Sequence, residues 1–370
     1  NTENKVLVWS GSASTFMTAL APGSAPPAKH ALDFAGFLLL MNHSGGLRQI
    51  RYADNTLIQT DPWTNTFTVD GELDDEITGG IQYERSAYLY TKHTVSRLSH
   101  VGGNPDFSTQ LVKQFGAVPR TIQKASYLDL GEVMISFGFD RHVRVFDGSE
   151  DRIISTSIEQ RNGMSEAYLE NVNIAHLQKS HAMVDTEEQT YRLWVVMAPS
   201  TEVTHCFCLN LRTGSWYPYL NTNLNAAVMA ESGNSRILMA VKRDGFIHVL
   251  NSSNTDSGTA IAEFYESPPL FSETPRAVTK SQKVSFYFFP TSSGTVYYSD
   301  RTNLSALFGS PRERIFLTDT STLIQVNKVI DLPRTQNVLQ FRLSSSSATT
   351  APWKLTRVDF EHQDMGIGGG

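Results

Sequence analysis

The sequence predicts an all-β fold, and within that class a β-propeller built of repeated antiparallel meanders. Short runs of apolar and β-branched residues alternate with turn residues along most of the chain. The clearest such run, from Gly116 to Gly148, contains expected strands at 122–128, 133–137 and 143–146. A unit of about 40 to 50 residues, with three or four strands, returns roughly five times between Ala31 and Ser267. One meander alone leaves unpaired strand edges and exposed apolar faces, so neighbouring sheets are expected to cover it.

The expected strands follow one another with turn residues between them. The turns include Asp129-Leu130-Gly131, Gly138-Phe139-Asp140, Ser232-Gly233-Asn234 and Arg243-Asp244-Gly245, whose residues tolerate left-handed backbone or bond their own backbone. A short helix is expected at 162–171. Up to the proline pair Pro268-Pro269, the other strands are expected at 35–41, 49–52, 66–69, 77–83, 87–91, 95–99, 153–158, 181–184, 191–197, 205–211, 216–219, 228–231, 236–241, 246–250 and 261–266.

Beyond Pro268-Pro269 the strands are expected to lie further apart, at 284–289, 295–299, 314–317, 327–332, 338–343 and 354–361. Two interpretations fit this region. It forms a C-terminal β-sandwich-like region, or it supplies closing blades, with Val6 to Trp9 completing the ring. The expected domains are therefore an N-terminal strand and flexible arm at 1–30, propeller blades at 31–267, a C-terminal β-rich domain or closing blades at 268–365, and a flexible tail at 366–370.

Composition excludes several classes. The chain has 370 residues, of which 40% are apolar and 18% charged, so it can fill a core and is not expected to be disordered. A formal charge of −6 gives no support for a broad nucleic-acid surface. No run approaches ~18 apolar residues, so no membrane span is expected. No signal peptide is visible, and the start at Asn1 leaves open a preceding segment.

The two cysteines, Cys206 and Cys208, are predicted to be buried thiols. Residues two apart in a strand point to the same side, with parallel Cβ directions, so a disulfide between them is not expected. No further cysteine stands at metal-ligand spacing.

Candidate chemical residues do not combine into a site. A glycosidase needs two carboxylates facing each other across a cleft, and nothing in the sequence pairs the available ones. These are Asp74, Asp75, Glu76, Asp140 and Asp256. The histidines, including His142, His176, His181 and His205, lack convincing metal-ligand spacing, and no nucleotide-binding or hydrolase motif is present. We therefore assign no catalytic, cofactor-binding or metal-binding residue.

Tryptophans and weak basic clusters have structural interpretations. Trp63, Trp216 and Trp353 each follow a turn, where a role in locking sheets together is favoured over stacking on a sugar. Basic residues gather at Arg312 and Arg314 and between Lys280 and Lys283. They are expected to be solvated, although inward-facing cations would matter if a ring enclosed DNA.

The order of elements resembles that of bacteriophage tail-hub and nozzle proteins over most of residues 35–362. The segments that carry the resemblance are Ile77-Thr78-Gly79 with Ala87 to Leu98, Gly116 to Gly148, Tyr191 to Tyr217, Asp244 to Ser267, and Gln340 to Leu343. The resemblance implies a structural virion protein without enzymatic activity, catalytic residues or cofactors. It implies a homo-oligomeric ring at the tail or head–tail junction, with other tail or neck proteins as partners and DNA passing through its channel.

Two alternatives to the virion protein remain open at this stage. One is a carbohydrate-binding adhesin on the same scaffold, which would bind a host surface glycan through Trp63 or Trp353. The other is a propeller glycoside hydrolase that depends on Asp75 or Asp140. The resemblance implies synthesis in the host cytoplasm and a final location in the virion, but symmetry, blade count and host do not follow from the sequence.

Overall fold

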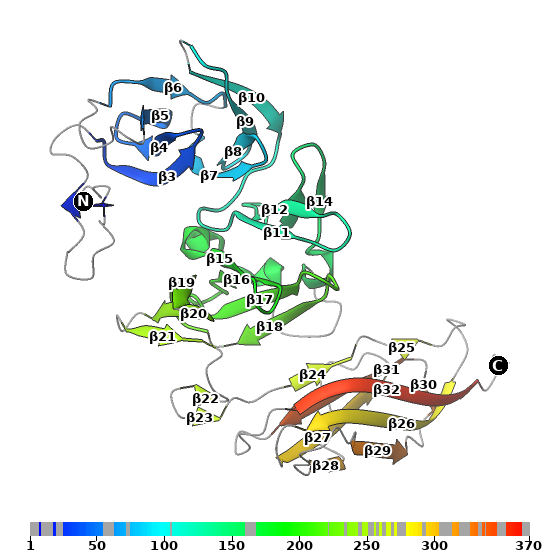
Figure 1. Cartoon of the computed structure of the whole chain (residues 1–370). Coiled ribbons are helices and arrows are strands. Elements are labelled where there is room, and N and C mark those ends of the chain that lie inside the picture. The colour runs from blue at the N-terminus through cyan, green and yellow to red at the C-terminus, as the bar shows by residue number, and fades with distance from the viewer. Residues whose placement is uncertain are drawn as a thin grey trace. The chain divides into compact units, whose positions relative to one another are not determined.

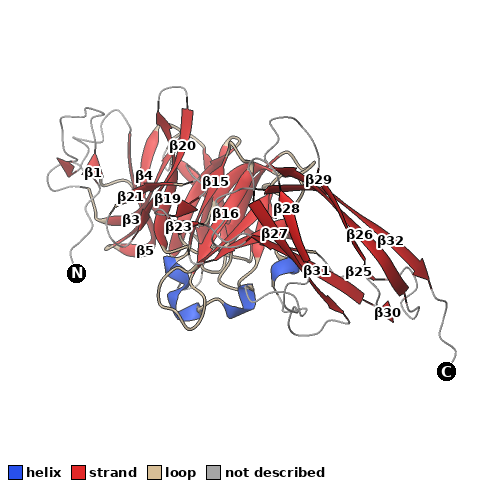
Figure 2. Ribbon diagram, turned by 90° about the horizontal axis from the view of Figure 1, so that it is seen from below, coloured by secondary structure: helices blue, strands red, loops and turns tan. Residues whose placement is uncertain are grey.

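The computed structural model is all-β, as predicted, and consists mainly of antiparallel sheets joined by short turns (Figures 1 and 2). The structure describes residues 7–8, 18–19, 25–54, 63–71, 75–103, 106–159, 168–220, 222–232, 235–242, 246–250, 255–256, 259–260, 264–267, 270–271, 279–290, 294–302, 313–317, 326–331, 335–336, 338–345 and 353–364. Most of the expected N-terminal arm, the expected tail at 366–370 and most of the expected helix at 162–171 lie outside these residues.

The chain forms two compact units. The first comprises residues 1–160 and 166–250, and the second comprises 161–165 and 251–370. The expected boundary at 267 therefore lies inside the second unit. The physical reason is strand pairing, because β24 (Phe264–Glu266) pairs with β31 (Val338–Ser345) of the C-terminal region and does not extend the preceding meander.

Five sheets follow one another in the first unit, and each is a meander of consecutive strands. The first sheet contains β3 (Ala28–Phe34), β4 (Phe37–His43), β5 (Gly46–Asp54) and β6 (Thr66–Thr68). The second contains β7 (Ile77–Tyr83), β8 (Ser86–Thr91), β9 (Val95–His100) and β10 (Phe107–Lys113). The third contains β11 (Gln123–Ser126), β12 (Glu132–Phe137), β13 (Val143–Phe146) and β14 (Asp151–Ile153).

The fourth sheet contains β15 (His181–Asp185), β16 (Thr190–Val195), β17 (His205–Asn210) and β18 (Trp216–Leu220). The fifth contains β19 (Leu224–Ser232), β20 (Ser235–Lys242) and β21 (Ile247–Val249). Between the third and fourth sheets lie three short 3-10 helices, η1 (Thr156–Ile158), η2 (Leu169–Asn171) and η3 (Ile174–Lys179), drawn in blue in Figure 2. A pair of two-residue strands, β1 (Leu7–Val8) and β2 (Thr18–Ala19), precedes the first sheet.

The five sheets pack in series through their first strands. β3 contacts β7, β7 contacts β11, β11 contacts β15 and β15 contacts β19. Each junction has its own apolar core. Leu39 and Ile50 meet Leu89 and Leu98 between the first and second sheets, and Tyr90 meets Met134 and Phe146 between the second and third. Val133 and Ile135 meet Tyr191 and Leu193 between the third and fourth sheets, and Trp194 and Cys206 meet Leu238 and Ala240 between the fourth and fifth. Figure 1 shows the series from the blue first sheet to the light-green fifth.

Strand β12 shows why the central sequences are apolar at nearly every position. Successive side chains of a strand point to opposite faces of the sheet. Val133 and Ile135 therefore face the fourth sheet, while Met134 faces the second. All three are fully buried, because this sheet is covered on both faces.

In the described part of the chain, one face of the fifth sheet is buried and the other is exposed. Leu238 and Ala240 pack against the fourth sheet. The register places Val228 opposite Met239, and Val241 opposite Ile247, on the other face. Val228 is 56% exposed and Ile247 is 67% exposed, so this outward face is apolar and accessible.

The second unit contains two sheets that share one core. One sheet joins β24, β25 (Leu270–Phe271), β27 (Gly294–Thr302), β28 (Glu313–Leu317) and β31, and the other joins β26 (Thr279–Pro290), β29 (Val326–Asp331), β30 (Thr335–Gln336) and β32 (Trp353–Asp364). Phe286 of β26 lies 5.6 Å from Tyr298 and 5.1 Å from Phe341 of the opposite sheet, measured between ring centroids. This face-to-face packing is the sandwich-like arrangement expected as one of the two alternatives. A small hairpin of β22 (Thr255–Asp256) and β23 (Thr259–Ala260) also belongs to this unit.

Candidate functional site

The predicted carboxylates stand on separate elements of the chain. Asp75 and Glu76 precede β7, Asp140 lies in the turn between β12 and β13, and Asp256 lies in the hairpin of the second unit. Asp74 lies outside the described residues. The side chains of Asp75, Glu76 and Asp140 each bond partners within the chain, whereas that of Asp256 lies outside the description.

Glu76 ties the first two sheets together. Its carboxylate accepts a hydrogen bond from Asn42 of β4 at 3.0 Å and forms ion pairs with Lys29 at 3.1 Å and Lys92 at 3.0 Å. Burial alone would raise the pKa of Glu76, but these hydrogen bonds from Asn42, Lys92 and Lys29 lower it from 4.5 to about 2. Glu76 is therefore a fixed negative charge with a structural role.

We expect Glu76→Gln to remove an acid-sensitive part of the stability. The depressed pKa means that the stabilisation is present above pH 4.5 and is lost as the pH falls towards 2. After allowance for solvent screening, the loss at pH 7 should be about 1–2 kcal/mol. Urea unfolding at pH 7, 4 and 2.5 measures it, with the exposed Glu150→Gln as control. A wild-type advantage of the same size at all three pH values would contradict this role.

Asp140 is also committed to a partner within the chain. Both of its oxygens accept hydrogen bonds from Arg144, at 2.9 and 2.7 Å, and one accepts the backbone N–H of His142. Burial raises the pKa of Asp140, but the bonds from Arg144 and His142 outweigh it and hold that pKa below its usual value. The interpretation of Asp140 as a turn residue agrees with this geometry.

The histidines lie apart and serve different contacts. His142 Nδ1 lies 2.7 Å from Glu159 Oε1, and His205 Nδ1 lies 2.9 Å from Thr204 Oγ1. His181 stacks on Trp194 at 5.1 Å, and burial lowers its pKa to about 4, so its ring is neutral at pH 7. His176 lies in η3. Within the described part of the chain, no three His, Cys, Asp or Glu side chains gather as metal ligands.

The aromatic and sulfur predictions can be compared with the structure directly. Trp63 is fully buried with Leu40 and Ala53 of the first sheet, so it locks this sheet and the suggestion that it stacks on a sugar is wrong. Trp216 is half-buried and donates its indole N–H to the carbonyl of Ile154 at 2.8 Å. The side chain of Trp353, and those of Lys280, Lys283, Arg312 and Arg314, lie outside the description. Cys206 and Cys208 are buried free thiols, with their sulfurs 3.6 Å apart.

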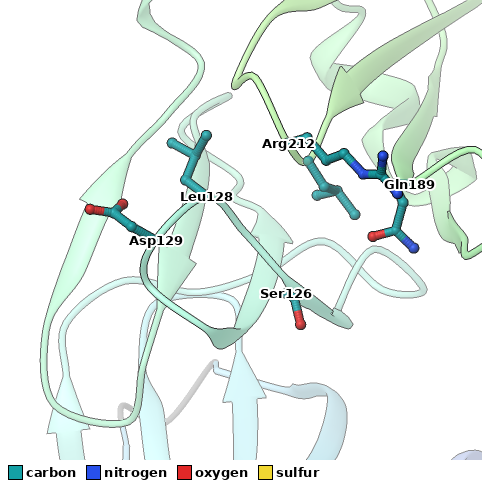
Figure 3. Close-up of a pocket in the computed structure, with 6 residues that line it drawn as sticks. Ser126, Leu128, Asp129, Gln189 and Arg212 are labelled. Carbon is teal, nitrogen blue, oxygen red and sulfur yellow. The ribbon is translucent and has the colours of Figure 1, made fainter.

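The turns of the third and fourth sheets form a depression of about 420 Å³, which we call the turn depression. Its lining residues are Ser126, Leu128, Asp129, Gln189, Leu211 and Arg212. Ser126 ends β11, and Leu128 and Asp129 follow in the turn to β12. Gln189 precedes β16, and Leu211 and Arg212 follow β17. Figure 3 shows Arg212 and Gln189 side by side, across a gap from Leu128 and Ser126.

Backbone hydrogen bonds fix these turns to one another. Leu128 N–H donates to the carbonyl of Leu211 at 2.9 Å, and Leu211 N–H donates to the carbonyl of Gln189 at 2.9 Å. Leu128 and Gln189 have φ of 48° and 53°, a left-handed backbone that is uncommon for residues other than glycine. Such conformations persist only where the surroundings hold them, so the walls of the depression are preorganised.

The side chains divide the depression into polar and apolar parts. Arg212 and Ser126 are exposed, and Leu128 is 42% exposed above the buried Leu211. The Asp129 carboxylate lies on the outer side of its turn and points away from Arg212 and Gln189 (Figure 3). The groups available to a ligand are therefore a guanidinium, an amide and a hydroxyl beside a leucine surface.

Sequence reasoning missed this depression, although it identified the turns that build it. Asp129-Leu130-Gly131 and the turn at Gly214 were both expected. The missing information was that turns about 60 to 80 residues apart meet at one place, which follows from the packing of β11 on β15.

Comparisons with known proteins find similarity to solved structures only. No family model matches the chain, and no curated protein matches it. An exo-β-1,3-galactanase from Phanerochaete chrysosporium, solved with β-1,3-galactotriose, is 9% identical, with a TM-score of 0.34 over 96% of this chain and 100% of that one. The same enzyme with galactose gives 9% identity and a TM-score of 0.32 over the same shares. A glycoside hydrolase gives 10% identity and 0.29 over 90% of this chain and 96% of that one.

These findings correct the predicted function. The solved structures named above are glycoside hydrolases and none is a virion protein, so the predictions of a phage structural role and of no enzymatic activity are overturned. The expected virion location, ring assembly and DNA channel depended on the resemblance to phage tail proteins, which these comparisons do not support. At TM-scores below 0.5, the similarity transfers no catalytic residue, substrate or reaction to this chain. No helix in the described residues is both long and apolar enough to cross a membrane.

Proposed function

We propose that this chain is a carbohydrate-binding protein, with the turn depression as its glycan site and a five-bladed β-propeller as its scaffold. The serial packing of the five meanders through their first strands supports the propeller. In this arrangement, the apolar outward face of the fifth sheet is the surface that closes the ring. The glycan site rests on a separate observation, the interlocked turns that hold Arg212 and Gln189 opposite Ser126 and Leu128.

The chemistry of the depression favours a saccharide over other ligands. Guanidinium, amide and hydroxyl groups bond sugar hydroxyls, and Leu128 offers an apolar surface to the C–H face of a sugar ring. No aromatic side chain is among the lining residues described, so a nucleobase has no ring to stack on. The formal charge of −6 opposes association with nucleic acid. A shallow, preformed wall suits an extended ligand such as a glycan.

We expect Arg212→Ala to weaken glycan binding by about tenfold, because a charged hydrogen-bond donor is lost. The measurement is a glycan array, followed by titration calorimetry with the best ligand. Release of reducing ends in the same samples reports any turnover. Arg212 is exposed, and its backbone N–H rather than its side chain bonds Asn210, so the fold should be unaffected.

Two control variants sharpen this experiment. Arg97→Ala removes an exposed arginine of β9 in a different sheet and should bind as wild type. Glu150→Gln changes an exposed residue outside the depression and should also leave binding intact. Absence of any glycan ligand for wild type, or equal binding by Arg212→Ala, would contradict the proposed function.

A further inference from the structure

A smaller depression of about 270 Å³ lies beside the first sheet. We call it the Asp75 pocket, and its lining residues are Gly45, Gly46, Leu47, Arg48, Gln49, Thr68 and Asp75. Gly45 to Gln49 come from the turn between β4 and β5 and from the start of β5, and Thr68 ends β6. Asp75 stands at the entry to β7 of the second sheet, so this pocket is built from different elements than the turn depression.

Asp75 is a buried carboxylate, and only one of its two oxygens accepts hydrogen bonds. It is 0% exposed. Its Oδ1 accepts the backbone N–H of Lys92 at 2.9 Å and that of Glu76 at 3.0 Å. Its Oδ2 has no hydrogen-bond partner in the described residues. A buried charged oxygen left unsatisfied carries a large desolvation penalty, so a partner from outside the chain would be bound favourably.

The surroundings of Oδ2 define what that partner is. A Cβ placed on Gly71 would lie 3.6 Å from Asp75 Oδ2 and 3.6 Å from Arg48 Nη1, so both atoms border the same space beside Gly71, and no ion pair joins them in the described residues. Arg48 Nη1 instead donates to the carbonyl of Gly71. A metal cation is disfavoured here, because Asp75 is the one carboxylate among the described lining residues and a positive charge is already near. An anion is disfavoured by the carboxylate itself.

A neutral group that donates a hydrogen bond fits both charges. A hydroxyl can donate to Asp75 Oδ2 and accept from Arg48, with Gln49 as a further polar contact. Leu47 is 46% exposed and supplies apolar surface. Gly45 and Gly46 leave the rim bare, and an added Cβ at Gly45 would lie 2.8 Å from His43 Cε1. This combination of paired polar groups and a small apolar patch matches one sugar ring or a polyol.

We propose that the Asp75 pocket is a second binding site, which takes the hydroxyl groups of a single saccharide ring through Asp75 Oδ2 and Arg48. The site does not depend on the turn depression, since no lining residue is shared. Binding gives Asp75 Oδ2 a hydrogen-bond donor. It also requires the Arg48 side chain to make room for the ligand.

In the test, methyl glycosides of glucose, galactose and mannose are each titrated with the full chain, and binding is measured by ligand-detected NMR. We expect at least one of them to bind wild type with a Kd of about 1 mM. Asp75→Asn should weaken that binding by about tenfold or more, because the amide nitrogen that replaces Oδ2 cannot accept the hydrogen bond that the ligand hydroxyl donates. The carboxamide oxygen of this variant can still accept both backbone N–H bonds, so the melting temperature reports whether the fold is kept.

Further variants separate this site from the proposed function. Arg212→Ala should leave methyl glycoside binding at the Asp75 pocket unchanged, and so should Asp140→Asn, a carboxamide control elsewhere. Thr68→Trp, at an exposed position of β6, should block the pocket without touching Asp75 and serves if Asp75→Asn fails to fold. The proposal is overturned if no methyl glycoside binds wild type, if both pocket variants bind as wild type, or if binding is lost with Arg212→Ala instead.

Discussion

Gly116→Ala is expected to destabilise the first unit by about 3 kcal/mol or more. A Cβ on Gly116 would lie 2.0 Å from the carbonyl oxygen of Lys92 and 2.4 Å from that of Thr91. Both neighbours are backbone atoms, and Ala117 N–H already bonds Thr91 O at 3.0 Å, so neither can move aside by a side-chain rotation. The segment after β10 must pass this close to the end of β8, and only glycine permits it.

Urea unfolding followed by circular dichroism measures the effect of Gly116→Ala. Gly71→Ala is the matched control, because its Cβ would meet its nearest atoms at 3.6 Å, an ordinary contact distance. The control should change the free energy of unfolding by no more than about 0.5 kcal/mol. Equal stability of the two variants would show that the close approach of Gly116 to Lys92 is not present in solution.

Arg192→Met is expected to cost about 3–5 kcal/mol, because it leaves a buried carboxylate without its counter-charge. Arg192 is 3% exposed and pairs with Asp185 at 3.0 Å and with Glu188 at 2.6 Å. Asp185 is itself 4% exposed at its side chain, whereas Glu188 is 46% exposed and can turn to water. The destabilisation therefore comes mainly from the buried Asp185 carboxylate, which is left without a counter-charge.

The double variant Arg192→Met/Asp185→Asn distinguishes charge from packing. The carboxamide that replaces the Asp185 carboxylate is neutral. It can still accept the backbone N–H groups of Glu187 and Glu188, which Asp185 Oδ1 accepts at 3.1 Å. We therefore expect the double variant to be more stable than Arg192→Met alone, with a coupling of more than about 1 kcal/mol. Additive losses in the unfolding free energies would instead assign the effect to lost packing around the guanidinium.

The sequence predicted the two central strands of the third sheet nearly to the residue. Strands were expected at 133–137 and 143–146 and are found at Glu132–Phe137 and Val143–Phe146. The local signal was strong there, because turn residues bound each strand and apolar residues fill it. The strand expected at 153–158 was wrong, because Asp151–Ile153 pairs with β13 and Thr156–Ile158 forms a 3-10 helix. In the second unit, β26 begins five residues before the expected 284, since its polar first residues pair with β30 and β32.

Neither depression could be predicted from residue patterns. Gln189 and Arg212 are ordinary turn residues by composition, and they become neighbours of Ser126 only through the packing of two sheets. Asp75 was a candidate, but its half-satisfied carboxylate depends on the position of Lys92 in the turn between β8 and β9. The burial of Trp63 agrees with the favoured locking role, but the sequence alone left sugar stacking open, because the apolar surface of the first sheet that covers Trp63 is assembled from distant residues.

The serial contact of the five sheets determines how local unfolding spreads through the first unit. A sheet that packs mainly against its predecessor and successor passes energetic changes on one junction at a time, as in a linear array of repeats. Opening of the fifth sheet breaks one junction, whereas opening of the third breaks two. Of the five sheets, the third, next to the turns that carry the proposed glycan site, therefore resists local melting most, and the first and fifth yield before it. Closure of the proposed ring would give these two end sheets a second junction and reduce that difference.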